Sequence, residues 1–268
     1  MAQLGNIEPA AMAERHGDPG RLTNRIALVT GASRGLGRFF AETLAREGAH
    51  VILANRSDVP DITEGIARAG GKANFVEMDV TRDDSILGAF ERIVAQWGPP
   101  AVVVNNAGIT DVADTLKEDP AEFDRVISTN LRGPWMIARE AARHLVAAKL
   151  PGAIVNVASI LALRQAGQVT AYATAKAGLV QMTKQLALEW ARYRIRVNAL
   201  APGYVETDFN RDFFRTEKGQ EMIRRIPSRR LTPMQDLAEP LMLLAGDGGA
   251  SITGVVLPVD AGHLLSGL

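Results

Sequence analysis

From Ile26 onward, short runs of apolar and β-branched residues alternate with longer stretches in which apolar residues recur every three or four positions. The short runs predict buried strands, and the longer stretches predict helices that cover them. The predicted strands are Ile26–Thr30, His50–Ala54, Ala73–Glu77, Val102–Asn105, Ala153–Val157, Arg196–Ala201 and Val255–Val259. The predicted helices are Gly35–Glu47, Val59–Ala69, Asp83–Trp97, Ala121–Ala148, Thr170–Arg192 and Asp236–Ala245.

Strands that alternate with helices indicate right-handed βαβ crossovers and a parallel sheet with helices on both faces. The strands read as apolar throughout, which is typical of a sheet buried on both faces. No internal repeat or linker divides the chain. We therefore expect one doubly wound α/β domain over residues 25–268, preceded by an N-terminal tail, residues 1–24. Ligands of such sheets bind beyond the carboxyl ends of the strands.

The composition is that of an ordinary soluble protein, with 47% hydrophobic and 22% charged residues. Thirty basic and 30 acidic side chains balance, so nothing favours nucleic-acid or membrane binding, and self-association meets little charge repulsion. There is no cysteine, which excludes disulfides and thiolate catalysis, and the four histidines show no metal-ligand spacing, so no metal is expected. Neither a membrane-spanning run nor a secretory signal is recognisable, and a cytoplasmic location is expected.

A glycine-rich turn follows the first strand directly. It reads Thr30-Gly31-Ala32-Ser33-Arg34-Gly35-Leu36-Gly37 and opens the first predicted helix. Glycines permit a tight turn and a close approach of the backbone, and the helix N-terminus attracts a pyrophosphate. Glycines also mark ordinary turns, so the spacing alone leaves both interpretations open. The candidate cofactor contacts are Gly31, Ser33, Arg34, Gly35, Leu36 and Gly37.

The end of the second strand bears on the choice of dinucleotide. An acidic residue would hold the ribose of NAD here, but the chain has Asn55 followed by Arg56. A guanidinium makes two charge-assisted bonds to a phosphate, and Arg34 offers a second one. The sequence therefore favours NADP(H), with NAD(H) possible if Arg56 only begins a solvated loop.

Two further strand ends supply candidate cofactor contacts. Asp79-Val80 closes the third strand, where the carboxylate would accept a hydrogen bond from adenine or would simply cap a turn. Asn105-Asn106-Ala107-Gly108 ends the fourth strand, where small residues let the backbone approach a ribose and the amides hold the central strands. An asparagine-rich turn without function is the alternative.

Tyr172 and Lys176 lie four residues apart on one face of a predicted helix. A lysine cation would lower the phenol pKa from about 10 toward a useful range. Ser159, after the fifth strand, would orient a substrate oxygen, and Asn130 would distort its helix and hold a water leading to Lys176. Singly, each residue has an ordinary structural explanation; jointly they predict hydride transfer to or from nicotinamide, with Tyr172 exchanging the proton.

These motifs resemble the short-chain dehydrogenase/reductase family from about Arg25 to the C-terminus. The resemblance rests on Thr30–Gly37, Asp79, Asn105-Asn106-Ala107-Gly108, Asn130, Ser159, Tyr172 with Lys176, and Pro202-Gly203. It implies a Rossmann-type sheet of about seven strands and a catalytic tetrad of Asn130, Ser159, Tyr172 and Lys176, with Tyr172 and Lys176 also contacting the cofactor. It also implies that Pro202, Gly203, Val205 and Thr207 lie beside the nicotinamide. Ala261 departs from the Asp-Gly-Gly often found near the C-terminus.

The substrate lid implied by the resemblance covers about residues 204–230, and lids are usually mobile. Phe209, Phe213 and Phe214 would cover an apolar substrate, whereas Arg211, Arg215, Arg164 or Arg229 would contact a carboxylate or phosphate unless they are surface residues. The chain looks most like 3-oxoacyl-thioester reductases or sugar-acid dehydrogenases, which the side chains do not separate.

Residues 121–148 and 170–192 are apolar on more than one helix face and therefore need a further partner. By resemblance they pair across a two-fold axis, so we expect a homotetramer, with a dimer as the alternative. The C-terminal Val255–Leu268 would make a second interface. Competing functions are a catalytically silent NADP-binding sensor or partner module and a nucleotide-sugar epimerase or dehydratase.

Overall fold

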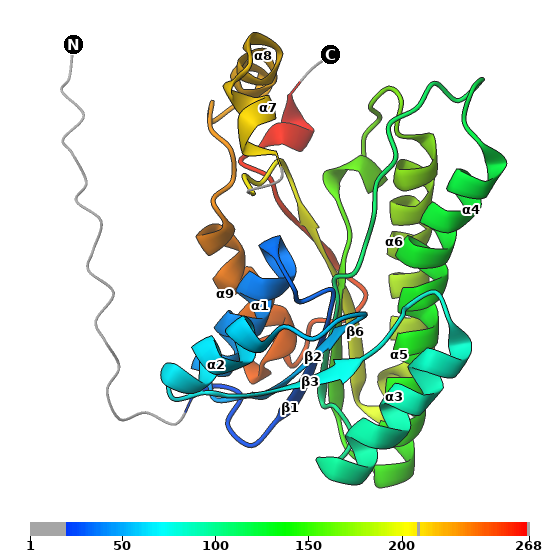
Figure 1. Cartoon of the computed structure of the whole chain (residues 1–268), viewed down its shortest axis with the longest axis vertical. Helices are drawn as coiled ribbons and strands as arrows, with labels where there is room; N and C mark the ends of the chain where they lie inside the picture. The colour runs from blue at the N-terminus through cyan, green and yellow to red at the C-terminus, as the bar shows by residue number, and fades with distance from the viewer. Residues whose placement is uncertain (1–19, 208–209, 267–268) are drawn as a thin grey trace, which may run out of the picture.

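The computed structural model describes residues 20–207 and 210–266. Within them, seven parallel strands form one sheet in the order β3-β2-β1-β4-β5-β6-β7 (Figure 1). The strands are β1 (Ile26–Thr30), β2 (His50–Asn55), β3 (Lys72–Glu77), β4 (Val102–Asn105), β5 (Gly152–Val157), β6 (Ile195–Pro202) and β7 (Val256–Val259). The predicted α/β fold is confirmed, and each strand boundary differs from its prediction by one residue at most.

Helices cover both faces of the sheet (Figure 1). One face carries α1 (Gly35–Arg46), α2 (Pro60–Arg68) and α9 (Ala238–Ala245); the other carries α3 (Asp83–Gln96), α4 (Pro120–Ile127), α5 (Gly133–Ala148) and α6 (Thr170–Trp190). Above the carboxyl ends of the strands lie α7 (Arg211–Arg215) and α8 (Glu217–Arg225). The short helical turns are η1 (Ser128–Arg132), η2 (Ile160–Ala162), η3 (Ala191–Tyr193), η4 (Met234–Leu237), η5 (Asp247–Gly249) and η6 (His263–Leu265).

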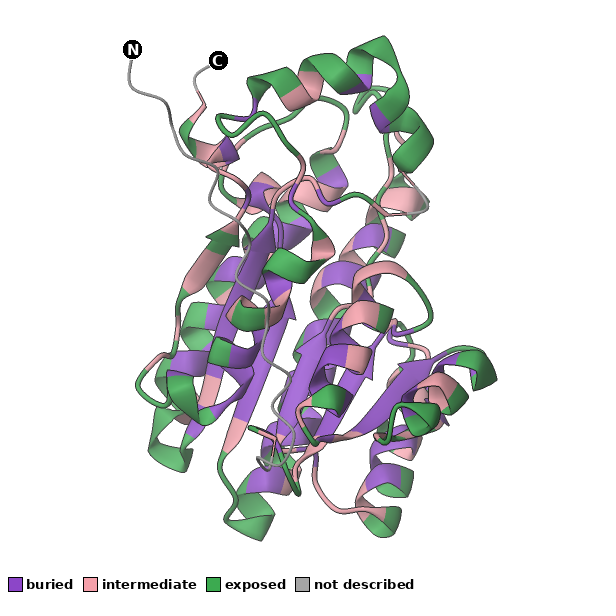
Figure 2. Ribbon diagram, turned by 90° about the vertical axis from the view of Figure 1, so that its left-hand side faces the viewer, coloured by how far each residue is buried: buried purple, intermediate pink, exposed green. Residues whose placement is uncertain are grey.

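The core has two halves, one on each side of the sheet. Val29 of β1 packs into the half that includes α1 and α9, whereas its neighbour Leu28 packs into the half that includes α3 and α5. Figure 2 shows the central strands buried along their length between helices whose outer faces are exposed. The edge strand β3 departs from the expectation of apolar strands, because Lys72 and Asn74 are exposed. Only one side of an edge strand has a neighbour, so polar residues are tolerated there.

The predicted helix Ala121–Ala148 is wrong as one continuous element. It consists of α4, the π-helical turn η1 and α5, and Gly133 donates its N–H to the carbonyl of Ser128, five residues earlier. A π turn inserts one extra residue into a helix and is frequent at functional sites. The other long helix, α6, ends at Trp190 and continues as the 3₁₀ turn η3.

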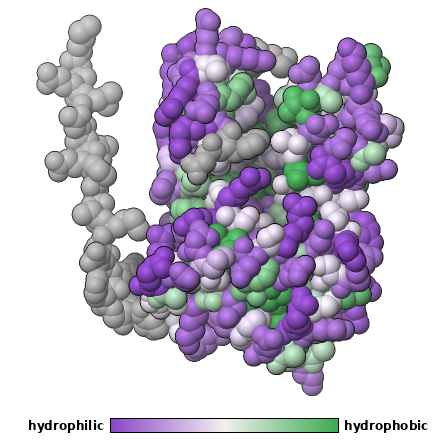
Figure 3. Space-filling model, viewed as in Figure 1, coloured by the Kyte–Doolittle hydropathy of each residue, from purple (hydrophilic) through white to green (hydrophobic). Residues whose placement is uncertain are grey.

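The strand order reverses between β1 and β4, so the turn after β1 and the Asn105 end of β4 lie side by side. This is the point at which open α/β sheets bind ligands. Residues 20–24, the end of the predicted tail, belong to the fold. Leu22 is completely buried, and its backbone N–H donates to the carbonyl of Glu47 at 2.8 Å. Of the described helices, none is long and apolar enough to cross a membrane, and hydrophilic residues cover most of the face in Figure 3.

Candidate active site

The glycine turn packs directly against the end of β4. Gly31 has a φ of 63°, and a Cβ on Gly37 would lie 2.1 Å from the Gly31 carbonyl oxygen, so no side chain fits there. The Asn106 side chain donates to the carbonyls of Thr30 and Gly31 at 3.0 and 3.1 Å. The N–H groups of Asn106 and Ala107 both donate to the Thr30 hydroxyl. The turn is therefore held in shape by β4.

Asparagines also tie the central strands together, as expected. The Asn105 amide donates to Asn156 Oδ1 of β5 at 2.9 Å, and Asn156 donates to Thr183 of α6 at the same distance. Asn105 also donates to the carbonyl of Pro134 in α5. This buried chain of hydrogen bonds links β4 and β5 to the two helices that cover them.

At the end of β2, the Asn55 side chain is buried, and within the described part of the chain neither its Oδ1 nor its Nδ2 has a hydrogen-bond partner. Arg56 and Arg34 are exposed, and among the described residues neither forms an ion pair. The glycine turn beside them has Ser33 exposed and Leu36 packed against the core. A buried amide and two exposed cations that form no ion pair among the described residues suit a ribose phosphate, although the Asp79 carboxylate lies near Arg56.

Asp79 caps a turn, which was one of its two predicted roles. Its Oδ1 accepts from the N–H and the hydroxyl of Thr81 at 2.9 and 2.7 Å. Partial burial works to raise the carboxyl pKa, but these hydrogen bonds and the nearby charge of Arg56 outweigh it, so the pKa is lowered. Val80 is buried, and its carbonyl lies against Gly133 at the start of α5. The predicted adenine contact stays a prediction.

Tyr172 lies on the first turn of α6, half-buried, with its hydroxyl near the Ser159 side chain. Ser159 follows β5 and also caps η2, because its Oγ accepts from the N–H of Leu161 at 3.1 Å. The two residues that were predicted to contact a substrate oxygen are thus brought together. Burial raises the Tyr172 pKa, and the Ser159 hydrogen bond opposes that shift without reversing it.

Lys176 does not lower the pKa of Tyr172 in this structure, so that expectation is wrong here. Its Nζ donates to the carbonyl of Val157 at 2.6 Å and lies 5.7 Å from the Tyr172 ring centroid. Its side chain is buried, and this desolvation lowers the lysine pKa to about 8. The phenol pKa is raised instead, because the desolvation of Tyr172 is the largest effect on it.

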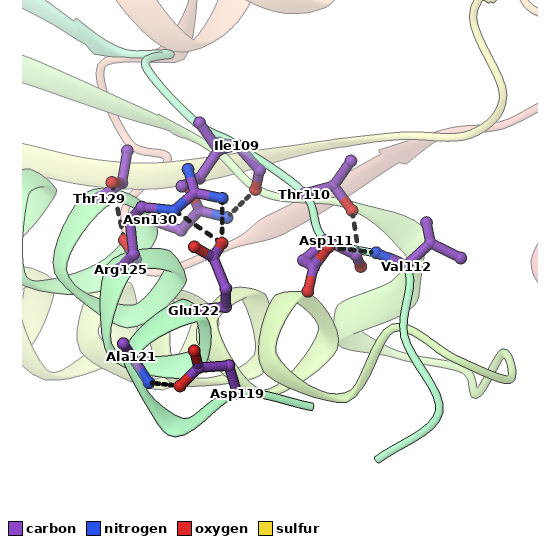
Figure 4. Close-up of polar contacts among 10 residues, drawn as sticks. All are labelled: Ile109, Thr110, Asp111, Val112, Asp119, Ala121, Glu122, Arg125, Thr129 and Asn130. Carbon is purple, nitrogen blue, oxygen red and sulfur yellow. Dashed lines mark hydrogen bonds and ion pairs between the residues drawn. The ribbon is translucent and has the colours of Figure 1, made fainter. Parts of the chain in front are cut away.

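Asn130 sits in the π turn and is completely buried. Its side chain lies beside Ile109 (Figure 4). Its Oδ1 accepts from the N–H of Ile109 at 2.9 Å, and its Nδ2 donates to the Ile109 carbonyl at 2.7 Å. The predicted distortion of the helix is confirmed, and the predicted water stays a prediction. The segment after β4 is thereby held close to Lys176, since a Cβ on Gly108 would lie 3.3 Å from Asn130 Oδ1 and 3.7 Å from Lys176 Nζ.

The segment after β6 lies opposite the glycine turn. Among the described residues, Thr207 is the only neighbour within 4 Å of a Cβ built on Gly35. Asn210 fixes this segment, because its side chain accepts from the N–H of Thr207 at 2.8 Å and donates to the carbonyl of Val205 at 2.9 Å. Pro202 is the last residue of β6. Gly203 packs against Asp260, where a Cβ would approach within 2.7 Å.

Several contributors to this arrangement were not found from sequence. The Thr30 hydroxyl and the Asn210 side chain organise the backbone around the site, but a lone threonine or asparagine in a loop carries no distinctive spacing. Phe209 lies outside the described residues, whereas Phe214 is buried and Phe213 is exposed. Among the described residues, no group of acidic and histidine side chains is arranged to bind a metal.

Comparison with known proteins identifies the family. Residues 31–263 match the family model described as Enoyl-(Acyl carrier protein) reductase. The 3-oxoacyl-[acyl-carrier-protein] reductase FabG of Pseudomonas aeruginosa is 37% identical over 250 residues, which are 91% of this chain and 99% of that protein. The chain belongs to the short-chain dehydrogenase/reductase family.

Other members of the short-chain dehydrogenase/reductase family match equally large parts of the chain. The cis-4-hydroxycyclohexanecarboxylate dehydrogenase of Sinomonas cyclohexanicum is 37% identical over 241 residues, 89% of this chain and 96% of that protein. A solved gluconate 5-dehydrogenase from Burkholderia cenocepacia, in complex with NADP and tartrate, has a TM-score of 0.89 at 30% identity. That alignment covers 93% of this chain and 99% of the other. The protein is an NAD(P)-dependent oxidoreductase of this family.

Proposed function

We propose that the protein transfers hydride reversibly between NADP(H) and a secondary alcohol or the corresponding ketone, with Tyr172 moving the proton at the substrate oxygen. The observation that carries this proposal is the contact of the Tyr172 phenol with Ser159, one helical turn before the buried Lys176. A hydroxyl pair of this kind offers two groups to one substrate oxygen, and the buried lysine adds a titratable ammonium nearby.

The glycine turn and the segment after β6 would hold the cofactor, which would supply or accept the hydride through its nicotinamide when bound. In reduction, the Tyr172 hydroxyl gives its proton to the substrate oxygen; in oxidation, it takes the proton back. The Ser159 Oγ already accepts from Leu161, which leaves its own O–H to orient the same oxygen. Lys176, with a pKa of about 8, exists in both protonation states near neutral pH and replaces the proton that Tyr172 gives up.

Asn130 acts in this scheme as a positioning residue. By holding both backbone groups of Ile109, it fixes the segment that passes beside Lys176. A loop that is clamped at both its N–H and its carbonyl keeps its distance from the reacting groups.

We assign the cofactor preference to NADP(H) on the unpaired cations at the ribose end. Arg34 and Arg56 form no ion pair among the described residues, where the buried Asn55 side chain also has no hydrogen-bond partner. The NADP-bound relative from Burkholderia cenocepacia supports this choice by similarity. The assembly we propose is a cytoplasmic homotetramer that pairs α5 and α6, whose exposed apolar residues include Trp135, Val146 and Leu188. Light scattering at defined concentrations would determine the number of subunits.

Tyr172→Phe tests the mechanism, because it removes only the hydroxyl. We expect kcat for ketone reduction to fall at least 100-fold, the usual contribution of a general acid, while the Kd for NADPH changes little. The matched control is Tyr193→Phe, a tyrosine that lies in η3 at the far end of α6. A Tyr172→Phe enzyme with turnover near that of the wild type would overturn the assignment. Initial rates with NADPH and NADH, measured on the same ketone, test the cofactor preference.

A further inference from the structure

Arg164 follows Ser159 after the short turn η2. The turn η2 begins where Ser159 caps the N–H of Leu161, and the N–H of Arg164 closes it on the carbonyl of Ile160 at 3.0 Å. A bond of this kind brings the Cα atoms of Ile160 and Arg164 to about 6 Å, so Ser159, one residue earlier, lies within about 10 Å of Arg164. An arginine side chain that starts there lies within reach of any substrate group a few bonds from the carbonyl carbon.

The Arg164 guanidinium is half-buried and has no acidic partner among the described residues. One nitrogen, Nη1, donates to the carbonyl of His263 at 2.5 Å and to the hydroxyl of Ser266 at 3.0 Å. In the described part of the chain, Nε and Nη2 have no hydrogen-bond partner. A partly desolvated guanidinium with two unused donors and no counter-ion is most stable when an anion completes it.

The other arginines considered for this role differ from Arg164. Arg211 forms an ion pair with Glu206 at 2.8 Å, and Arg215 lies 3.7 Å from Asp212. Arg229 is exposed to solvent. Exposed cations, paired or not, discriminate weakly between ligands because water and salt screen them. Arg164 alone among these four combines partial burial with the absence of an acid.

The surroundings of Arg164 suit an organic acid. The Tyr204 ring lies 5.1 Å from the ring of His263 and 5.8 Å from that of Phe214, so aromatic side chains form a wall. The Arg164 charge lowers the pKa of His263, adding to the effect of burial, and it opposes the burial that raises the pKa of Tyr204. The carboxylate of Asp260, three residues before His263, accepts hydrogen bonds from the N–H groups of Gly262 and Leu264.

We infer that Arg164 binds the carboxylate of the substrate, so that the enzyme acts on an oxo or hydroxy acid rather than on an uncharged ketone or an acyl thioester. The carboxylate would use Nε and Nη2 in a two-bond contact, while Nη1 keeps its bonds to the C-terminal turn. Arg164 then serves as a specificity-determining residue at the far end of the substrate from Tyr172 and Ser159. This inference rests on the proposed function.

The test compares 4-oxocyclohexanecarboxylate with its methyl ester, which has the same ring and ketone but no charge. We expect the wild type to prefer the acid, and Arg164→Met to lower kcat/KM for the acid on the order of 100-fold, mainly through KM. The ester should be affected less than threefold, and Arg164→Lys should restore part of the preference. Ser266→Ala, which removes one bond of the C-terminal clamp and keeps the guanidinium, is the control and should leave the preference for the acid unchanged.

Equal losses for acid and ester in Arg164→Met would mean that the arginine only holds the C-terminal turn, and would overturn the inference. A wild type that reduces the ester without preferring the acid would also overturn it, while leaving the proposed function intact. If the wild type reduces neither compound, calorimetry with NADPH and 4-oxocyclohexanecarboxylate decides. If the wild type binds the acid and Arg164→Met does not, the carboxylate site is supported although the reaction assignment fails. If the wild type does not bind the acid, the carboxylate site is refuted.

Discussion

Burial of Lys176 predicts a measurable dependence of stability on pH. Its side chain is 4% exposed, and desolvation lowers its pKa from 10.5 to about 8. One pKa unit corresponds to about 1.4 kcal/mol, so at pH 7 the buried ammonium costs the folded state about 3 kcal/mol. Between pH 8 and 10.5 the folded protein has lost this proton while the unfolded chain still binds it. The unfolded state then binds more protons, and stability rises with pH in this window.

Replacing Lys176 by methionine removes this titration and preserves most of the side-chain volume. The free energy of unfolding of the wild type, minus that of Lys176→Met, should therefore increase by about 2 to 3 kcal/mol from pH 7 to pH 10. The lost hydrogen bond to Val157 shifts this difference by a constant and does not alter its slope. Taking the difference also cancels the titration of all other groups.

The assay is urea unfolding followed by circular dichroism at pH 7, 8, 9 and 10, at one protein concentration because oligomers gain apparent stability with concentration. Lys184→Met is the matched control, since Lys184 is exposed on the same helix and its replacement should give a flat difference. If the difference in the free energy of unfolding between the wild type and Lys176→Met also stays constant within about 0.5 kcal/mol, the argument that the fold buries a desolvated ammonium is refuted.

Ala261 has a φ of 57°, a conformation that costs a residue with a Cβ about 1 kcal/mol. Ala261→Gly should therefore raise the melting temperature and Ala261→Val should lower it, and the reverse order in a thermal scan would contradict this explanation. Thr30→Val leaves the N–H groups of Asn106 and Ala107 without their acceptor, so unfolding in urea should show a loss of about 2 kcal/mol. Thr30→Ser keeps the acceptor and should stay near the wild type; similar losses in both variants would point to the methyl group instead.

The strands, the glycine turn and the residues of the site were predictable because each depends on local signals. Val29 and Leu28 belong to an apolar run that only a sheet buried on both faces accommodates, and Gly31 stands where the chain must turn sharply. Ser159 and Tyr172 are 13 positions apart along the chain, too far for a local pattern to pair them. Their pairing was predicted from the resemblance to a known family.

What was missed depends on contacts between segments distant in sequence. A local distortion at Asn130 was predicted, but the contact that holds it was not, because Asn130 bonds to Ile109, 21 residues earlier, and helix periodicity holds no trace of that contact. The prediction that Lys176 lowers the pKa of Tyr172 was wrong because it rested on spacing alone. Spacing placed the two side chains together, but the carbonyl of Val157 and the burial of the ammonium decide where its charge acts.

Because of the π turn at Ser128–Arg132, the structure depends on the number of residues in this segment as well as on their identity. Each residue of an α-helix turns the chain by about 100°, so deleting one residue here would rotate α4 by that angle relative to α5. Asn130 would then point away from Ile109, although no side chain had been replaced. Homologues and engineered variants should accordingly accept insertions and deletions in the exposed loop 110–118, where backbone contacts are few, but should keep the number of residues from Asp119 to Pro134 constant.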